Sequence, residues 1–259
     1  PTRLLQAAAK GGEVKRGWYS NSRAAIDDIY KEDAEQFTAL LAALSPRTSV
    51  ESDALNSVTF FENWVAAGKP RQDAALQSLL TASVQKSATG SGVLNAWRPN
   101  VTRAMQEDMG ALSGPKVEQF RRNLTVTPEM TPWGPLAPGD AYTADAWAAG
   151  AHQFEQSLLG GRDQLKGLAT PEVLQCGDAD TTAAYLRATA DARRAGWEMS
   201  KVTGDEIPWA ASELQEAKWS YFKSLYELSA ELKTSAVDVV KRGLLTSERI
   251  AGTPDLTML

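Results

Sequence analysis

The chain has 259 residues, of which 43% are hydrophobic and 23% charged, and this composition is typical of a globular protein with room for a substantial core. Its single cysteine, Cys176, excludes an intramolecular disulfide and a four-cysteine iron–sulfur cluster, and its single histidine, His152, argues against a Ser-His-Asp triad or a multi-histidine zinc site. The formal net charge of −5 argues against general affinity for nucleic acid, although local patches can still bind phosphate.

A basic and aromatic cluster between residues 15 and 23 contains Trp18 and Tyr19. Ile26 and Ile29 follow it, so the cluster leads into a helix. Two interpretations are open. The cluster can contact a nucleic-acid backbone and stack on a base, or its two rings can pack on the protein core.

Two core helices come next, joined by the polar loop Ser45–Ser49. The segment Asp33–Leu44 has helical spacing, with apolar residues at Phe37, Leu40, Leu41 and Leu44. The loop ends this helix because the residue before Pro46 avoids the α region, and Ser49 is suited to cap the next helix. We predict the apolar face of that next helix from Leu55, Val58, Phe61 and Val65.

Helical spacing continues over Arg71–Ser83 and resumes from Val93 to Met105, where Pro99 kinks the helix or begins a new one. The stretch Leu112–Leu124 then predicts a tight turn that leads into a helix. Gly114 can take a positive φ.

Lys116 lies in the first turn of this helix, after Pro115, which suits the first helical position because it has no N–H to leave unpaired. A cation there opposes the helix dipole and is slightly misplaced for stability. Lys116 is therefore a candidate nucleophile.

The stretch Thr127–Gly139 contains four prolines and Trp133, and predicts a loop with no strand. The segment Asp140–Phe154 is expected to be helical. Asp145 lies near its start, where the helix dipole keeps a carboxylate ionised, and Trp147 can pack behind that carboxylate.

The C-terminal part predicts further helices and no strand of useful length. A long helix begins at Asp180 and carries a seam of small and apolar residues, namely Tyr185, Ala188, Ala192, Ala195, Met199 and Val202. Pro208 opens the last major helix, and a final helix is expected over Ala236–Gly243. The predicted fold class is all-α.

The hairpin Leu112–Val117, of the form Leu-x-Gly-x-Lys-Val, together with Asp145 two residues before a tryptophan, resembles the helix-hairpin-helix DNA glycosylases such as endonuclease III and 8-oxoguanine DNA glycosylase. This resemblance covers roughly Phe37–Ala149. The chain also resembles uncharacterised phage-encoded proteins that carry the run Ser-Pro-Arg-Thr-Ser-Val, found here at Ser45–Val50. This second resemblance covers most of the chain. The hairpin departs from the family in lacking a second glycine, and Thr127–Gly139 is an insertion.

The resemblance implies a two-lobed helical bundle, with a core lobe over 33–106 and a second lobe formed by 1–32 and 107–259. It implies that Lys116 attacks the sugar C1′ and that Asp145 supports the developing charge. The resemblance, together with charge and position, predicts DNA contacts at Arg47, Ser49, Gly114, Arg121 and Arg122. The alternative for Ser49 and its loop is that they only cap the following helix. The candidate base pocket consists of Trp18, Tyr19 and Trp147.

We therefore expect a DNA base-flipping enzyme, an N-glycosylase with or without AP-lyase activity. One alternative on the same fold is a phage thymine-hypermodification enzyme, an amino-acid:DNA transferase or a thymine pyrophosphorylase-like enzyme. Another is a non-catalytic virion or DNA-associated protein, which the acidic net charge suits.

The partner expected in each case is DNA. No apolar run approaches the roughly 20 residues of a membrane span, and the first residues do not resemble a signal peptide. The sequence has no P-loop, no dinucleotide-binding glycine motif and no zinc spacing. We expect a monomeric, phage-encoded protein of the bacterial cytoplasm, with no metal and no cofactor.

Overall fold

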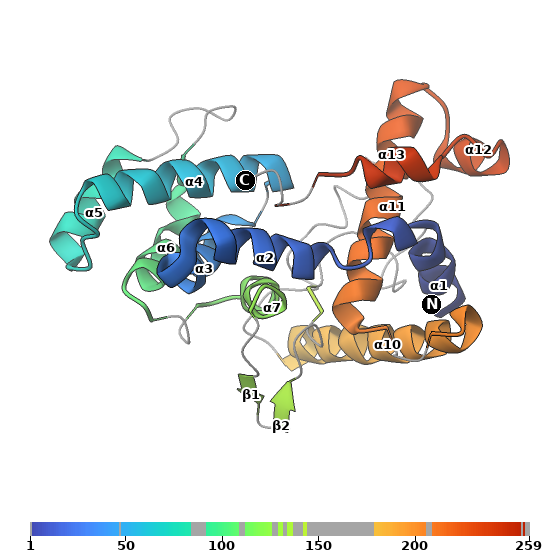
Figure 1. Cartoon of the computed structure of the whole chain (residues 1–259), viewed down its shortest axis with the longest axis horizontal. Coiled ribbons are helices and arrows are strands. Elements are labelled where there is room, and N and C mark those ends of the chain that lie inside the picture. Colours follow the sequence, from blue (N-terminus) through green and yellow to red (C-terminus); the bar gives the residue numbers. More distant parts are fainter. Residues whose placement is uncertain are drawn as a thin grey trace. The chain divides into compact units, whose positions relative to one another are not determined.

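A computed structural model describes residues 2–46, 48–83, 92–108, 112–125, 129–131, 134–136, 142–143, 179–205, 209–254 and 256. These residues are mostly helical (Figure 1). The helices are α1 (Thr2–Gly11), η1 (Glu13–Lys15), α2 (Trp18–Tyr30), η2 (Lys31–Asp33), α3 (Ala34–Leu44), α4 (Val50–Ala66), α5 (Asp73–Ala82), η3 (Asn95–Trp97), α6 (Arg98–Met105), α7 (Pro115–Asn123), α10 (Ala179–Thr203), α11 (Ala211–Glu231), α12 (Ala236–Lys241) and α13 (Ser247–Ala251).

The predicted all-α class is confirmed at this level, with one exception. Strand β1 (Glu129–Thr131) pairs antiparallel with β2 (Gly134–Leu136), so that Glu129 lies opposite Leu136. The expectation that Thr127–Gly139 contains no strand was therefore wrong for these residues. Each of these strands has only three residues, and their backbone groups pair locally. Such short strands do not require the alternation of apolar and polar residues by which a longer strand is identified in a sequence.

The chain divides into two compact units. Unit 1 consists of Pro1–Ser20 and Val126–Thr253, and unit 2 of Asn21–Thr125 and Pro254–Leu259. The sequence predicted that the hairpin and its helix belong to the second lobe, whereas α7 lies in unit 2. The reason is apolar packing of α7 against α3 and α6, where the buried cluster consists of Ala39, Ala42, Ala104, Leu112 and Val117, with Phe120 against it.

Helix α3 is the centre of unit 2. The four apolar residues predicted to face the core, Phe37, Leu40, Leu41 and Leu44, are fully buried. However, α3 is buried on every side and not on one face, because α4, α6 and α7 all pack against it. Phe37 stacks on Tyr30 with ring centroids 3.7 Å apart.

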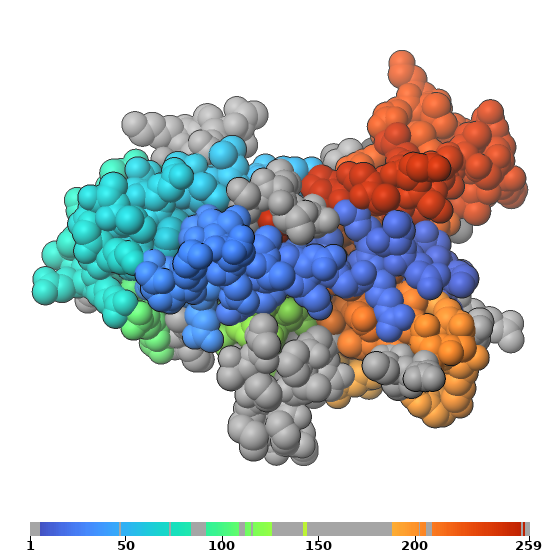
Figure 2. All heavy atoms as spheres, viewed as in Figure 1, coloured from blue at the N-terminus to red at the C-terminus, as the bar shows by residue number. Residues whose placement is uncertain are grey.

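Helix α4 buries a different face from the one predicted. Leu55 is 58% exposed and Val65 is 43% exposed, whereas Phe61 is buried as expected. Figure 2 shows the outer surface of α4, drawn in cyan. The buried face is Asp53, Ala54, Asn56, Ser57, Phe60, Phe61 and Trp64. The large aromatic residues of this face lie toward the C-terminal end of the helix. Toward the N-terminal end, the same face buries the polar side chains of Asp53, Asn56 and Ser57.

Helices α1, α10 and α11 form the core of unit 1 (Figure 1). The predicted seam of α10 is confirmed at Ala188, Ala192, Ala195 and Met199, all of which are buried; the side chains of Tyr185 and Val202 lie outside the described part. The backbones approach closely at Gly12, where an added Cβ would lie 1.8 Å from the carbonyl oxygen of Ala217 on α11. None of the helices described is long and apolar enough to cross a membrane.

Candidate functional site

The turn before α7 has the backbone that the sequence predicted. Gly114 has φ 106° and ψ 123°, a conformation that favours glycine, and Pro115 begins the helix. Ser113 is fixed to α6 by Asn100, whose Oδ1 accepts from the Ser113 N–H at 2.8 Å and whose Nδ2 donates to the Ser113 carbonyl at 2.8 Å. The start of α7 therefore has a defined position in unit 2.

Lys116 extends from this position to the α3–α4 loop. Its Nζ donates to the carbonyl oxygen of Ser45 at 3.3 Å, while the indole Nε1 of Trp97 donates to the carbonyl oxygen of Pro46 at 3.1 Å. Farther along the loop, the Ser49 side chain accepts from the Ser52 N–H at 3.2 Å, which confirms Ser49 as the N-cap of α4. Two motifs that are distant in the sequence, the hairpin and the Ser45–Ser49 loop, therefore meet.

Asp53 is a residue of this region that the sequence did not single out. It lies in the first turn of α4, is only 4% exposed, and its Oδ1 makes no hydrogen bond to any part of the chain that is described. Burial raises the pKa of the Asp53 carboxyl well above its usual range, and the positive charge of Lys116 opposes this rise. A buried acid that has an unused acceptor and a raised pKa is common at functional sites.

The polar character of this region continues along α4. Ser57, one turn after Asp53, is fully buried, and its Oγ also lacks a hydrogen-bond partner among the described atoms. Asn56 is satisfied, because its Oδ1 accepts from the Gly92 N–H at 2.8 Å. The spacing 53, 57, 60, 61 and 64 is helical, and this was the signal in the sequence that could have identified Asp53.

The two predicted DNA-contacting arginines lie at the other end of α7. Arg121 and Arg122 are both partly buried, and Arg122 forms an ion pair with Glu118 one turn earlier. Cations in the last turn of a helix also interact favourably with its dipole. The two side chains can therefore stabilise the C-terminal end of α7, and phosphate binding is not needed to explain them.

Three predicted site residues, Arg47, Asp145 and Trp147, lie outside the described residues, so the pairing of Lys116 with Asp145 stays a prediction. Trp18 and Tyr19 belong to unit 1 and are 6% and 5% exposed. Their rings meet edge to face at 5.0 Å. A base could stack on either ring only after this packing had opened.

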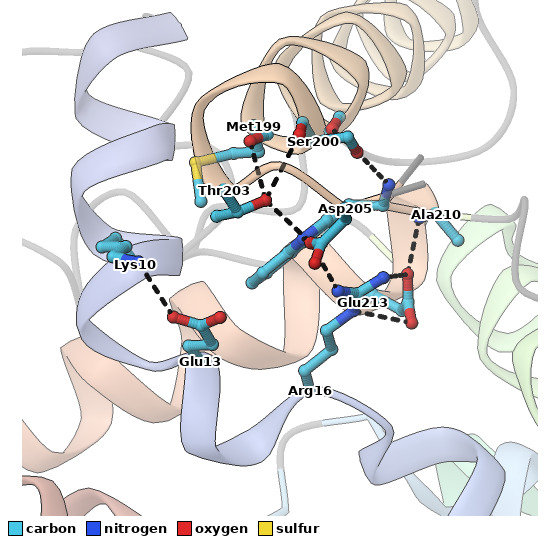
Figure 3. Close-up of polar contacts among 11 residues, drawn as sticks. Lys10, Glu13, Arg16, Met199, Ser200, Thr203, Asp205, Ala210 and Glu213 are labelled. Carbon is cyan, nitrogen blue, oxygen red and sulfur yellow. Dashed lines mark hydrogen bonds and ion pairs between the residues drawn. The ribbon is translucent and has the colours of Figure 1, made fainter. Parts of the chain in front are cut away.

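Unit 1 contains a second polar cluster, around Arg16 (Figure 3). The guanidinium binds Glu213 through Nε at 3.0 Å and Asp205 through Nη1 at 2.9 Å, and stacks 4.5 Å from the ring centroid of Trp209. Asp205 also accepts from Thr203 and from Trp209 Nε1, each at 2.7 Å. Because these groups satisfy one another, the cluster is a structural clamp between the N-terminal segment and the start of α11.

Two further ionisable groups are buried in unit 1. Glu216 accepts the backbone N–H groups of Gly17 and Tyr19, the latter at 2.8 Å, and so caps the start of α2. Burial raises its pKa to about 8, although the N–H donors of Tyr19 and Gly17 oppose the shift. The Nζ of Lys218, which is 1% exposed, donates to the Tyr142 hydroxyl.

The comparisons with known proteins identify no relative. No protein-family model, no curated protein and no solved structure matches this chain. Within the part of the chain that is described, no three His, Cys, Asp or Glu side chains gather as metal ligands would. The site in which Lys116 meets the Ser45–Ser49 loop is thus defined by its geometry alone.

Proposed function

We propose that this chain is a DNA base-flipping enzyme of the helix-hairpin-helix glycosylase type, which removes a damaged or modified base and acts on phage or host DNA in the bacterial cytoplasm. The observation that supports this most is the position of Lys116. A glycine turn of positive φ leads into α7, and the amine of the lysine in its first turn donates to the carbonyl oxygen of Ser45, at the start of the Ser45–Ser49 loop.

Each part of this site has a role in the proposed reaction. The N–H groups of the first turn of α7 favour an anion, and a DNA phosphate is the anion proposed here. Lys116 attacks C1′ of the flipped nucleotide, and its covalent attachment to the sugar gives the lyase activity. Asp145 is proposed to stabilise the developing sugar cation.

A non-catalytic DNA-associated protein is the second candidate, and the formal net charge of −5 favours it. The same helical site could also serve a transferase that joins an amino acid to a modified thymine. The three functions differ in their products. A glycosylase releases a base, a transferase incorporates the amino acid into DNA, and the non-catalytic protein does neither.

Borohydride trapping tests the proposal. The chain is incubated with a panel of duplexes carrying damaged or phage-modified bases, and base release and the borohydride-reduced protein–DNA adduct are measured. We expect Lys116→Ala to abolish the adduct, and Lys31→Ala, at an exposed lysine of unit 2, to retain it. Absence of both base release and adduct across the panel would contradict the glycosylase function, and incorporation of labelled amino acid into DNA would establish the transferase.

A further inference from the structure

The solvent face of α10 carries a tryptophan between two cations. Trp197 is 53% exposed, whereas Ala195 and Met199, on the opposite side of the helix, are buried. Arg193 lies one turn before Trp197 and Lys201 one turn after it, and both are exposed. The spacing of four residues places these three side chains, Arg193, Trp197 and Lys201, in one row along the helix. We call this row the α10 stripe.

The rotation of α10 about its axis is fixed by close contacts on its buried side. A Cβ added at Gly196 would lie 2.3 Å from the carbonyl oxygen of Trp209, so the two backbones approach as only glycine allows. The Oγ of Ser200 accepts from the Trp209 N–H at 2.8 Å and donates to the Gly196 carbonyl at 3.0 Å. The helix cannot turn Trp197 inward without breaking these contacts, so the exposure of its ring is a consequence of the fold.

The charges of the stripe suit an anionic ligand. Lys201 Nζ lies 3.4 Å from the centroid of the Trp197 ring, so one cation is held directly at the ring. The acidic residues of this part of α10, Asp191 and Glu198, are half-buried and lie on another side, because each residue turns the helix by about 100°. In a chain whose formal net charge is −5, such a row attracts a polyanion locally.

We propose that the α10 stripe binds single-stranded nucleic acid. One base stacks on the indole of Trp197, and the phosphates on either side of that nucleotide meet Arg193 and Lys201. The two cations are eight residues apart, which is about 12 Å along the helix axis, so an oligonucleotide that follows the axis reaches both. The stripe belongs to unit 1 and Lys116 to unit 2, and this inference does not rest on the proposed function.

A lipid surface is the other partner that a tryptophan between cations can contact. A helix that lies in a membrane interface inserts a continuous apolar face. The apolar face of α10 is instead buried in the core of unit 1, through Ala188, Ala192, Ala195 and Met199. Trp197 is the one large apolar residue that is exposed among the side chains of α10 that the structure describes. Stacking on a base requires only this one ring, so a single-stranded nucleic acid fits the stripe better.

Fluorescence anisotropy with labelled oligonucleotides of roughly ten nucleotides tests the stacking. The ligands are oligo-dT, oligo-U and an abasic oligonucleotide of the same length and charge, and the first two decide between DNA and RNA. We expect the wild-type chain to bind at least one base-bearing ligand about 5- to 150-fold more tightly than the abasic one, the range that stacking of one base gives. Trp197→Phe should keep this preference, and Trp197→Leu should remove it because leucine is apolar but has no ring.

Salt dependence tests the two cations. Arg193→Gln and Lys201→Gln should each lower the slope of log affinity against log salt by about 0.7, the value for one phosphate of a single strand. Lys10→Gln, at an exposed lysine of α1 that pairs with Glu13, is the control and should keep the wild-type slope. All of these positions are exposed, so the variants should retain the wild-type circular dichroism spectrum.

Equal affinity for abasic and base-bearing oligonucleotides, or a preference that Trp197→Leu retains, overturns the proposal. Binding to vesicles of anionic phospholipid, in a chain that binds no oligonucleotide, would assign the stripe to a lipid surface and also overturns it. Lys116→Ala separates this result from the enzyme assay, because it should lose the borohydride adduct and keep oligonucleotide binding. Loss of that binding in Lys116→Ala, with binding retained in Trp197→Leu, would assign the contact to α7 and contradict the proposal for α10.

Discussion

The carbonyl oxygen of Ser45 accepts a hydrogen bond of 3.3 Å from the amine of Lys116. This contact joins the end of α3 to the start of α7, and the buried Asp53 lies in the first turn of α4, after the same loop. The arrangement has a cost, because Asp53 and Ser57 are buried with unsatisfied oxygens. Sites that retain such groups commonly exchange stability for function, and the first prediction concerns that exchange.

Asp53→Asn is expected to stabilise the chain at pH 8, by ~1–2 kcal/mol. The pKa of Asp53 is raised in the folded state, so its contribution to stability is full below its unfolded pKa and is lost as pH rises through the folded pKa. The gain should therefore be largest at high pH and small at pH 4. Chemical denaturation at both values measures it, and a variant less stable than the wild type at pH 8 would show that Asp53 contributes to folding.

Glu216 should make stability depend on pH in the same direction. Burial raises its pKa from 4.5 to about 8, so the folded state binds more protons than the unfolded state between these values, and stability falls as pH rises from 4.5 to 8. Glu216→Gln removes this titration and should reduce the slope of the free energy of unfolding against pH.

Denaturant titrations at several pH values measure this slope. Glu227→Gln, at a half-exposed position on the same helix, should keep the wild-type slope. Because Asp53 contributes a slope of the same sign, combining Glu216→Gln with Asp53→Asn should flatten it further. An unchanged slope in Glu216→Gln would show that Glu216 is ionised throughout this pH range.

Arg16→Met should lower the melting temperature by about 3–6 °C, since it removes two ion pairs and a cation–π contact from one partly buried side chain. Arg194→Met provides the control, because Arg194 is 73% exposed and pairs only with Glu198 one turn away among the contacts described. That change should be nearly neutral. Equal effects of the two substitutions would contradict a clamp at Arg16.

Gly12→Ala should destabilise unit 1 by more than about 3 kcal/mol, because the new Cβ would meet the Ala217 carbonyl oxygen at 1.8 Å and force α1 and α11 apart. Gly68→Ala tests backbone strain alone. Gly68 has φ 81° and open space around its Cβ position, so that change should cost only ~1 kcal/mol. Denaturant unfolding followed by circular dichroism compares the two variants.

Binding to DNA should weaken steeply with salt, and the slope tests the two arginines of α7. Each phosphate contact removed by Arg121→Ala or Arg122→Ala should lower the slope of log affinity against log salt by about 0.9, equally for unrelated sequences. Arg71→Ala, which removes an exposed arginine paired with Glu107 in unit 2, is the control. Fluorescence anisotropy at three salt concentrations measures all three variants. A slope unchanged by all three substitutions would show that Arg121 and Arg122 belong to the internal packing of α7.

The local features of this fold were predictable from the sequence. Gly114, Pro115 and Ser49 have the backbone and capping roles expected of them, because turn and cap preferences depend on neighbours within a few residues. The apolar residues of α3 and the small residues of α10 are buried as their spacing predicted, since helical periodicity requires only the 3.6-residue turn.

Tertiary structure decided which faces are buried and which distant residues meet. The sequence of α4 has two faces with helical spacing, and the one that includes Asp53 and Ser57 is buried. The choice between the two faces depends on how Phe60 and Trp64 pack against the rest of unit 2. Packing of α7 on α3 brings Lys116 to the Ser45 carbonyl, and burial within α4 raises the pKa of the Asp53 carboxyl.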